Sequence, residues 1–476
     1  MNVRKLRLGI LLILLGGGSV TAFGAKAQTL QDALVSAYLN RPQLRADHAR
    51  QRALDEDVSR AAGGWKPQVT LNGQAGYGKD RLSYDYLTPP QSVKESIHPE
   101  ALVLQLAQPL YDGGKTAADV DRTNFVVQGG LAHSESVEAT ILGDAVQSYY
   151  DLYRDQIVLD LTKKEVAALE TALKSARTRY ATNDVTVADV AESESRLARG
   201  IAQRVAAEGA LVASRSSFLQ ATGLTPGTLP PPSPLPALLL PASQEEALAL
   251  AIRNPTVREA EQALKAAQAD VEAAASALKP TLSLQLSDQY LYETSQGHFK
   301  TQYQEALLNL QVPFYSGGVD YARVREAKNI VAQRMSEIDE ARQQARDKTK
   351  RSLEQLKAAR DRIDALKQQV SSAEAALAAV TKELDTHEKE VIDELNAEQE
   401  LLDARISLTQ AQHDEATAAY SVLSFTGRLS ARALQLPVPV YDPGKYYQAE
   451  SGRWFGTGIP DQDQDPRKAD PKATPR

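Results

Sequence analysis

A six-residue motif occurs twice in this chain, as Pro109–Gly114 and again, 204 positions later, as Pro313–Gly318. The same offset, carried forward without gaps, aligns 109–223 with 313–427, and it places Asp189 on Asp393. The parts before the motif correspond at a different offset, because the second copy is shorter. We locate the extra residues of the first copy around Tyr84 to Pro99 and read them as a loop. A duplication on this scale predicts one fold unit built twice.

Each repeat is predicted to open with a helix, over 30–62 and 243–278, that ends before a proline. Strand patterns follow, in β-hairpins over 67–110 and 280–313. Val69 and Leu71 face one side, and Gln68 and Thr70 face the other. Return strands are expected at about 101–110 and 303–313. An apolar face opposite a polar face is typical of a membrane barrel. A half-buried hairpin of a water-soluble protein would give the same alternation.

A very long helix follows the glycine pair in each copy, over about 116–182 and 320–386. Apolar residues recur every seven positions, as at Leu159, Val166 and Leu173, which indicates coiled-coil packing. Each long helix reverses at a tip and returns, so that helical hairpins are predicted over 116–222 and 319–426. The glycine pairs that precede them are interpreted as barrel-to-helix turns: Gly113, Gly114, Gly317, Gly318.

The duplication and two flanking segments divide the chain into five parts. Residues 1–27 have a basic start, a short apolar run and the cleavage pattern Ala25–Ala27, and they are predicted to be a signal peptide. Repeat 1 covers 28–223, and repeat 2 covers 243–427. The segment 224–242 between them is a proline-rich linker. Residues 428–476 are predicted to form an equatorial segment, beside the middle of the helices, and a disordered tail.

The chain has no cysteine, and after the signal it has no run of about 18 apolar residues. Any membrane part is therefore expected to consist of strands. Four strands are too few for a closed barrel, since small barrels need about eight. The chain is thus predicted to oligomerise, and three copies would supply twelve strands.

Composition and motifs argue against nucleic-acid binding and catalysis. The formal charge is −7 and the pI about 5.6, whereas nucleic-acid binders usually carry a basic patch. The six histidines are scattered without metal-ligand spacing. No phosphate loop or nucleophile elbow is found. We therefore predict no catalytic residue, no cofactor, no metal and no nucleic-acid partner.

Three stretches resemble the TolC family of outer-membrane efflux proteins, in particular its type I secretion branch. They are Leu395–Arg405, Gln108–Gly114, and the tail with Tyr441–Pro443 and Arg453–Gly456. The resemblance implies a mainly α fold with a small β part, in which a trimeric 12-stranded β-barrel continues into a long helical barrel. It also implies a homotrimer in outer-membrane lipid with a large periplasmic part. A periplasmic adaptor protein and an inner-membrane transporter are the implied partners.

The resemblance further implies that the helix tips close the periplasmic end. Asp393 matches a carboxylate of the family's pore ring, and Asn396 stands at a second such position. Lys389 matches a basic residue that restrains the gate, and Leu384 replaces a frequent tyrosine. Asp189 is the repeat equivalent of Asp393. For Asp393 the alternative is an ordinary carboxylate near a positive helix start.

The tips themselves are predicted to be adaptor-docking positions: Asn183, Asp184, His387, Glu388. A solvated loop is the alternative there. For the whole protein we predict an exit duct for type I secretion or efflux, energised by a partner transporter. Two alternatives stay open, a multidrug or metal efflux channel and a periplasmic coiled-coil spacer without a pore.

Overall fold

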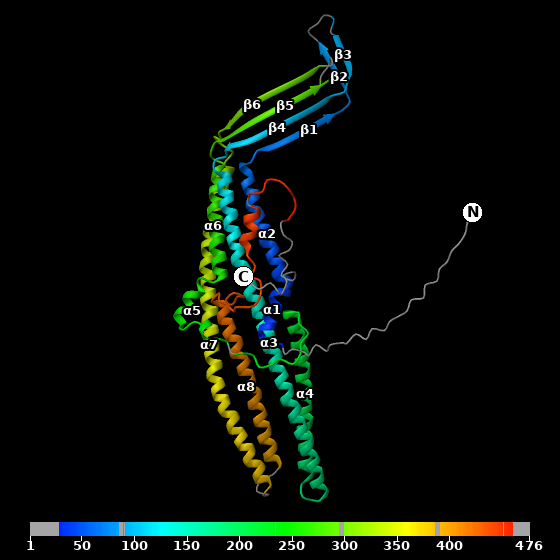
Figure 1. Ribbon diagram of the computed structural model, residues 1–476, viewed down its shortest axis with the longest axis vertical. Coiled ribbons are helices and arrows are strands. Elements are labelled where there is room, and N and C mark those ends of the chain that lie inside the picture. Colours follow the sequence, from blue (N-terminus) through cyan, green and yellow to red (C-terminus); the bar gives the residue numbers. More distant parts are fainter. Residues whose placement is uncertain are drawn as a thin grey trace, which may run out of the picture.

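The computed structural model describes residues 28–84, 89, 91–233, 235–294, 299–385, 391–450 and 452–459. The molecule is elongated, with a tilted sheet at one end and two helical hairpins reaching to the other (Figure 1). No helix among these residues is long and apolar enough to cross a membrane. The fold is mainly α with a small β part, as predicted. The helices and strands are α1 Leu30–Asn40, α2 Pro42–Ala62, β1 Gln68–Ala75, β2 Gly78–Tyr84, β3 Gln91–Ile97, β4 Glu100–Tyr111, α3 Lys115–Ala181, α4 Val187–Thr222, α5 Gln244–Ala251, α6 Pro255–Ser276, β5 Thr281–Tyr292, β6 Lys300–Gln311, α7 Val319–Asp385, α8 Val391–Phe425 and α9 Pro443–Glu450.

The two longest helices, α3 and α7, have 67 residues each and are therefore about 100 Å long. The apolar residues that recur every seven positions along α3 are buried. Leu159, Val166 and Leu173 are all less than one-tenth exposed. The lower part of α3 packs along α4, and its upper part packs along α2 and α6 (Figure 1). One long helix is thus covered by shorter helices that meet near mid-height.

The opening segment of each repeat is not one helix, as the sequence pattern had suggested, but two. Pro42 begins α2, and Pro255 begins α6. Proline lacks the N–H that would continue the helix, and it disfavours helical geometry in the preceding residue. Arg41 accordingly has extended backbone angles, and so does Asn254, whose side chain caps α6 through the N–H of Val257 at 2.9 Å. Both breaks follow from the proline.

The sheet has the order β1-β4-β5-β6 and joins the two repeats, because β4 of the first pairs with β5 of the second. The stretch around 84–99 was predicted to be a loop, and this prediction was wrong for residues 91–97. Within this stretch Gln91–Ile97 form β3, which pairs with β2 in a separate hairpin where Leu82 lies opposite Val93. Such a pair needs no buried face, and so the sequence offered no apolar alternation to reveal it.

The pairing register separates an apolar face of the sheet from a polar face. Leu71 lies beside Leu104, and Leu106 beside Leu286. The neighbouring row on the opposite face pairs Thr70 with Gln105 and Gln105 with Ser287. The apolar side chains are largely uncovered. The single chain therefore has a sheet with one face suited to lipid and one suited to water.

The main apolar core lies at mid-height, where α1, the linker and the segment after α8 surround α3, α4 and α8. Tyr149 and Phe218 are fully buried there. The hydroxyl of Tyr149 donates to the carbonyl of Pro230 at 2.9 Å, which ties the proline-rich linker to α3. The linker thus packs against the helices over part of its length.

Candidate functional site

The tip between α3 and α4 is a compact turn. Asn183 has a positive φ of 59°, which asparagine tolerates better than most residues. The N–H of Asp184 donates to the carbonyl of Arg179 at 2.9 Å, and its carboxylate pairs with the Arg179 guanidinium at 2.7 Å. Two of the four predicted tip residues therefore shape the first turn. The other two, His387 and Glu388, lie outside the described residues, as does the predicted gate residue Lys389.

Asp189 belongs to a reciprocal cap at the start of α4. Its carboxylate accepts from the N–H of Thr186 at 2.7 Å, while its own N–H donates to the Thr186 hydroxyl. The hydrogen bonds from the backbone and side chain of Thr186 lower the pKa of Asp189. This carboxylate therefore stays charged at the tip of the first hairpin, and it also caps the N-terminus of α4.

Asp393 lies at the corresponding place in the first turn of α8, beside Glu394. Glu394 accepts a hydrogen bond from the Thr381 hydroxyl at 3.0 Å, which connects α8 to the end of α7. Two carboxylates in one helix start are favoured by the helix dipole. The structure thus places the repeat pair Asp189 and Asp393 at the tips of the two hairpins.

The two hairpins are joined near their tips by Arg196, a residue that the sequence analysis missed. Its guanidinium donates to the side-chain carbonyl of Asn396 at 2.8 Å and pairs with Glu192 at 3.0 Å. The duplicated sequence could have indicated a role for Arg196. Glu192 is the repeat equivalent of Asn396, and Arg196 follows Glu192 by one helical turn. The predicted gate position Asn396 is therefore engaged by the other hairpin of the same chain.

A cleft of about 520 Å³ separates the hairpin tips. Leu384, Leu395 and Asp189 are among its lining residues. Farther along the helices, Glu165 of α3 faces carboxylates of α8. Burial, followed by the charges of Glu165 and Glu394, raises the pKa of Glu398 to about 7. The folded state therefore favours the protonated form of Glu398 at this contact between α3 and α8.

The four predicted turn glycines all have left-handed backbone angles. Gly113 and Gly114 have φ of 73° and 88°, and Gly317 and Gly318 have φ of 66° and 82°. In the first copy Asp112 supports the turn, since its carboxylate accepts from the N–H groups of Gly114 and Thr116. Each pair converts the direction of a strand into that of a long helix. No group of residues that could hold a metal ion is found in the described part of the chain.

Comparison with known proteins decides the family. The profile of outer membrane efflux proteins matches residues 33–224 and 248–428, one match for each repeat. This chain belongs to that family.

Individual relatives extend over nearly the whole chain. The outer membrane efflux protein BepC of Brucella suis is 31% identical over 453 residues, covering 94% of this chain and 96% of that protein. The proteases secretion protein PrtF of Dickeya chrysanthemi is 28% identical over 422 residues, covering 86% and 89%. The crystal structure of the CmeC channel of Campylobacter jejuni shares the fold, with a TM-score of 0.75 at 14% identity over 94% of this chain and 98% of that one.

The family membership indicates where the protein is located and which class of protein it is. The chain is an exit-duct protein of the outer membrane, with a large helical part in the periplasm. The predicted resemblance to the TolC family is confirmed. The relatives that cover most of the chain have names of efflux and secretion channels.

Proposed function

We propose that three copies of this chain form a passive duct for type I secretion. Each copy would contribute β1, β4, β5 and β6 to one closed barrel and its helices to a periplasmic tunnel. An inner-membrane transporter would supply the energy through a periplasmic adaptor docked at the hairpin tips. The chain itself would perform no chemistry. The proposal rests chiefly on a sheet that has one apolar face and one polar face, and whose two edge strands, β1 and β6, each have one edge that pairs with no other described strand.

The unpaired edges favour assembly because an open edge is not tolerated in lipid. Exposed aromatic side chains near both ends of the sheet agree with this membrane placement, since such residues gather at the two membrane boundaries. Near the helices are Trp65, Tyr111, Phe314 and Tyr315, and at the far end are Tyr77, Tyr290 and Phe299. The apolar band between these two groups would then be the part in contact with hydrocarbon.

Replacing Asp393 with alanine is expected to weaken block of the channel current by divalent cations. Three copies of Asp393 would form a ring of charge at the closed mouth, and like charges held close together attract cations. Single-channel recording of the purified protein in planar bilayers measures the block. Asp361→Ala removes an exposed carboxylate from the side of α7 and should leave the block as in the unaltered protein. Identical block in the Asp393 variant and the unaltered protein would remove Asp393 from the pore.

Deleting the encoding gene is expected to remove at least one protein from the culture medium and retain it in the cells. This expectation follows from the stretches shared with the secretion branch and from the similarity to PrtF. Quantitative mass spectrometry of medium and cells measures it. The similarity to BepC supports efflux of small molecules as a second candidate. An unchanged set of secreted proteins, combined with greater sensitivity to toxic compounds, would favour efflux over secretion.

A further inference from the structure

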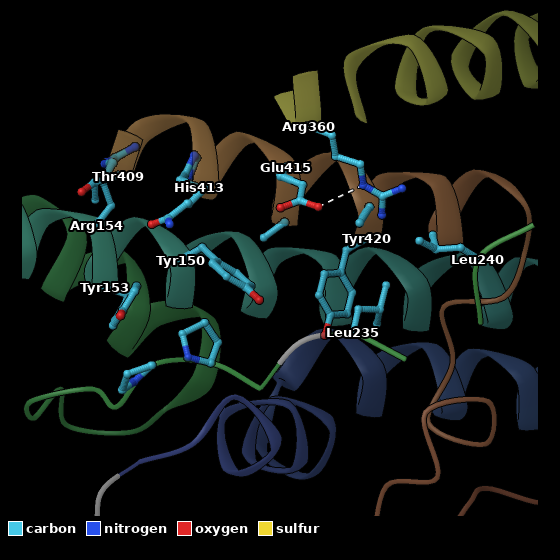
Figure 2. A pocket seen from close by; sticks show the side chains of 15 residues that line it. Tyr150, Tyr153, Arg154, Leu235, Leu240, Arg360, Thr409, His413, Glu415 and Tyr420 are labelled. Atoms are coloured by element: carbon cyan, nitrogen blue, oxygen red, sulfur yellow. Dashed lines mark hydrogen bonds and ion pairs between the residues drawn. The ribbon is translucent and has the colours of Figure 1, made fainter. Parts of the chain in front are cut away.

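A cavity of about 340 Å³ lies at mid-height, where α3 and α8 meet the proline-rich linker. Figure 2 shows that Tyr150, Tyr153 and Tyr420 project from these helices toward the linker, while Arg360 and Glu415 stand on the opposite side. Its volume is within the usual range of small-molecule pockets. None of these residues belongs to a site predicted from the sequence, and the cavity is far along the helices from the hairpin tips.

Two tyrosines in this cavity have hydroxyls without a partner. Tyr150 is only 8% exposed and Tyr420 only 6%. In the part of the chain that the structure describes, neither hydroxyl makes a hydrogen bond and neither oxygen is among the fully buried polar atoms that lack a partner, so both reach the open space of the cavity. Their neighbour Tyr149 follows the usual rule for buried tyrosines, because its hydroxyl donates to the carbonyl of Pro230. The two hydroxyls of the cavity are therefore available to a ligand.

The charges around the cavity already satisfy one another. Arg360 pairs with Glu415 at 3.0 Å, and Arg154 pairs with Asp155 at 2.8 Å. His413 lies 2.9 Å from Asp151 and 3.1 Å from Asp414. A ligand thus needs no net charge to enter, and what the cavity offers is apolar surface with two donor groups. Burial raises the pKa of both Tyr150 and Tyr420, so each hydroxyl keeps its proton and can donate.

The walls of the cavity offer aromatic and apolar surface. The rings of Tyr150 and Tyr420 lie 6.4 Å apart at an angle of 50°. Pro231, Pro232 and Leu235 of the linker supply apolar contacts from the other side. Aromatic rings pair favourably with other aromatic rings in tilted or offset arrangements, which favours an aromatic ligand between these walls. An aromatic ligand would therefore contact α3, α8 and the linker at the same time.

We propose that this cavity binds a small uncharged aromatic compound whose carbonyl or ether oxygen accepts hydrogen bonds from Tyr150 and Tyr420. The bound molecule holds the linker against both helical hairpins. The cavity is distinct from the cleft at the hairpin tips, and its ligand neither requires nor supports the proposed type I substrate.

Benzophenone tests the proposal, since it is an uncharged aromatic ketone that labels its surroundings covalently under near-ultraviolet light. The full mature protein, purified from outer membranes and placed in lipid nanodiscs, is irradiated with increasing benzophenone, and labelled peptides are mapped by mass spectrometry. We expect saturable labelling of peptides that contain 150–153, 231–235 or 416–420. Labelling of the strands through the lipid should rise without saturating.

The double variant Tyr150→Phe with Tyr420→Phe keeps both rings and removes both donors. We expect the benzophenone concentration for half-maximal labelling to rise about tenfold. Because the lost hydroxyls have no protein partner, the thermal unfolding midpoint without benzophenone should not fall. Tyr447→Phe, which alters a tyrosine outside the cavity, should label as the unaltered protein does. Labelling confined to the strands, or equal half-maximal concentrations in the double variant and the unaltered protein, would overturn the proposal.

Discussion

Replacing Gly113 with alanine should strongly reduce the amount of assembled protein in the outer membrane. Gly113 has a φ of 73°, and a side chain in this left-handed region costs about 1–2 kcal/mol. A Cβ atom there would also lie 2.7 Å from the carbonyl oxygen of Ser276 and 3.0 Å from Cβ of Lys279. Relieving such contact costs a further ~1–3 kcal/mol. The turn of repeat 1 and the end of α6 would have to separate.

Gly317→Ala is the matched control, because Gly317 occupies the repeat-equivalent position. Its φ is 66°, but a Cβ atom there meets nothing within 4 Å. This variant should lose only the contribution of backbone strain. Semi-native electrophoresis of outer membranes measures the heat-sensitive oligomer, and amide hydrogen exchange at 112–116 measures local opening. Equal amounts of oligomer and equal hydrogen exchange in the two variants would show that the close approach of Gly113 to Ser276 does not affect stability.

Replacing Asp151 with asparagine should destabilise the helical part by about 2–4 kcal/mol, because it breaks a mostly buried ion pair. His413 of α8 is 8% exposed, and its two ring nitrogens face Asp151 at 2.9 Å and Asp414 at 3.1 Å. Arg154 also pairs with Asp151, at 3.1 Å. Asp160→Asn is the control on the same helix, since its pair with Lys164 is exposed and should contribute less than about 1 kcal/mol.

The same network predicts a dependence on pH. Burial would lower the pKa of His413, but the hydrogen bonds to Asp151 and Asp414 outweigh it and raise the pKa above the ordinary 6.5. The folded state therefore favours the protonated ring. Its contribution is complete below the unfolded pKa and is lost as pH rises through the raised folded pKa.

Thermal unfolding followed by circular dichroism between pH 6 and 9 measures this loss. The midpoint of the unaltered protein should fall with rising pH more steeply than that of Asp151→Asn. Comparing the two proteins removes contributions common to both, including that of Glu398, whose raised pKa of about 7 also lowers stability as pH rises. Parallel curves would show that His413 carries no proton-linked stability.

The long helices could be predicted closely because their signals are local and repeated. The seven-residue spacing of Leu159, Val166 and Leu173 indicates one buried face of the helix. Glycine pairs mark where each long helix begins. Pro42 and Pro255 carried an equally local signal for the breaks in the opening segments, and the prediction of single helices was wrong there. A proline inside an otherwise helical pattern interrupts the helix even where the residues around it favour one.

Other features could not be predicted, either because they have no apolar pattern or because they depend on contacts between distant parts of the chain. The β2–β3 hairpin is polar and exposed, so no buried face imposes a pattern on it. The bond from Arg196 to Asn396 needs the two hairpins to be placed side by side. Likewise, the cavity with Tyr150 and Tyr420 exists only once the linker packs over α3 and α8. The gate roles of Asp393, Asn396 and Leu384 stay predictions that depend on assembly.

Cross-linking of the two sheet edges tests the proposed closed trimer most directly. The chain has no cysteine, so Thr70→Cys in β1 and Asn309→Cys in β6 introduce the only thiols, both on the polar face of the sheet. A bis-maleimide is added to outer membranes, and the products are separated by denaturing electrophoresis. A closed trimer predicts monomer, dimer and trimer bands and nothing larger, and no cross-linking in either single variant. A ladder that continues beyond the trimer, or monomer alone, would contradict it.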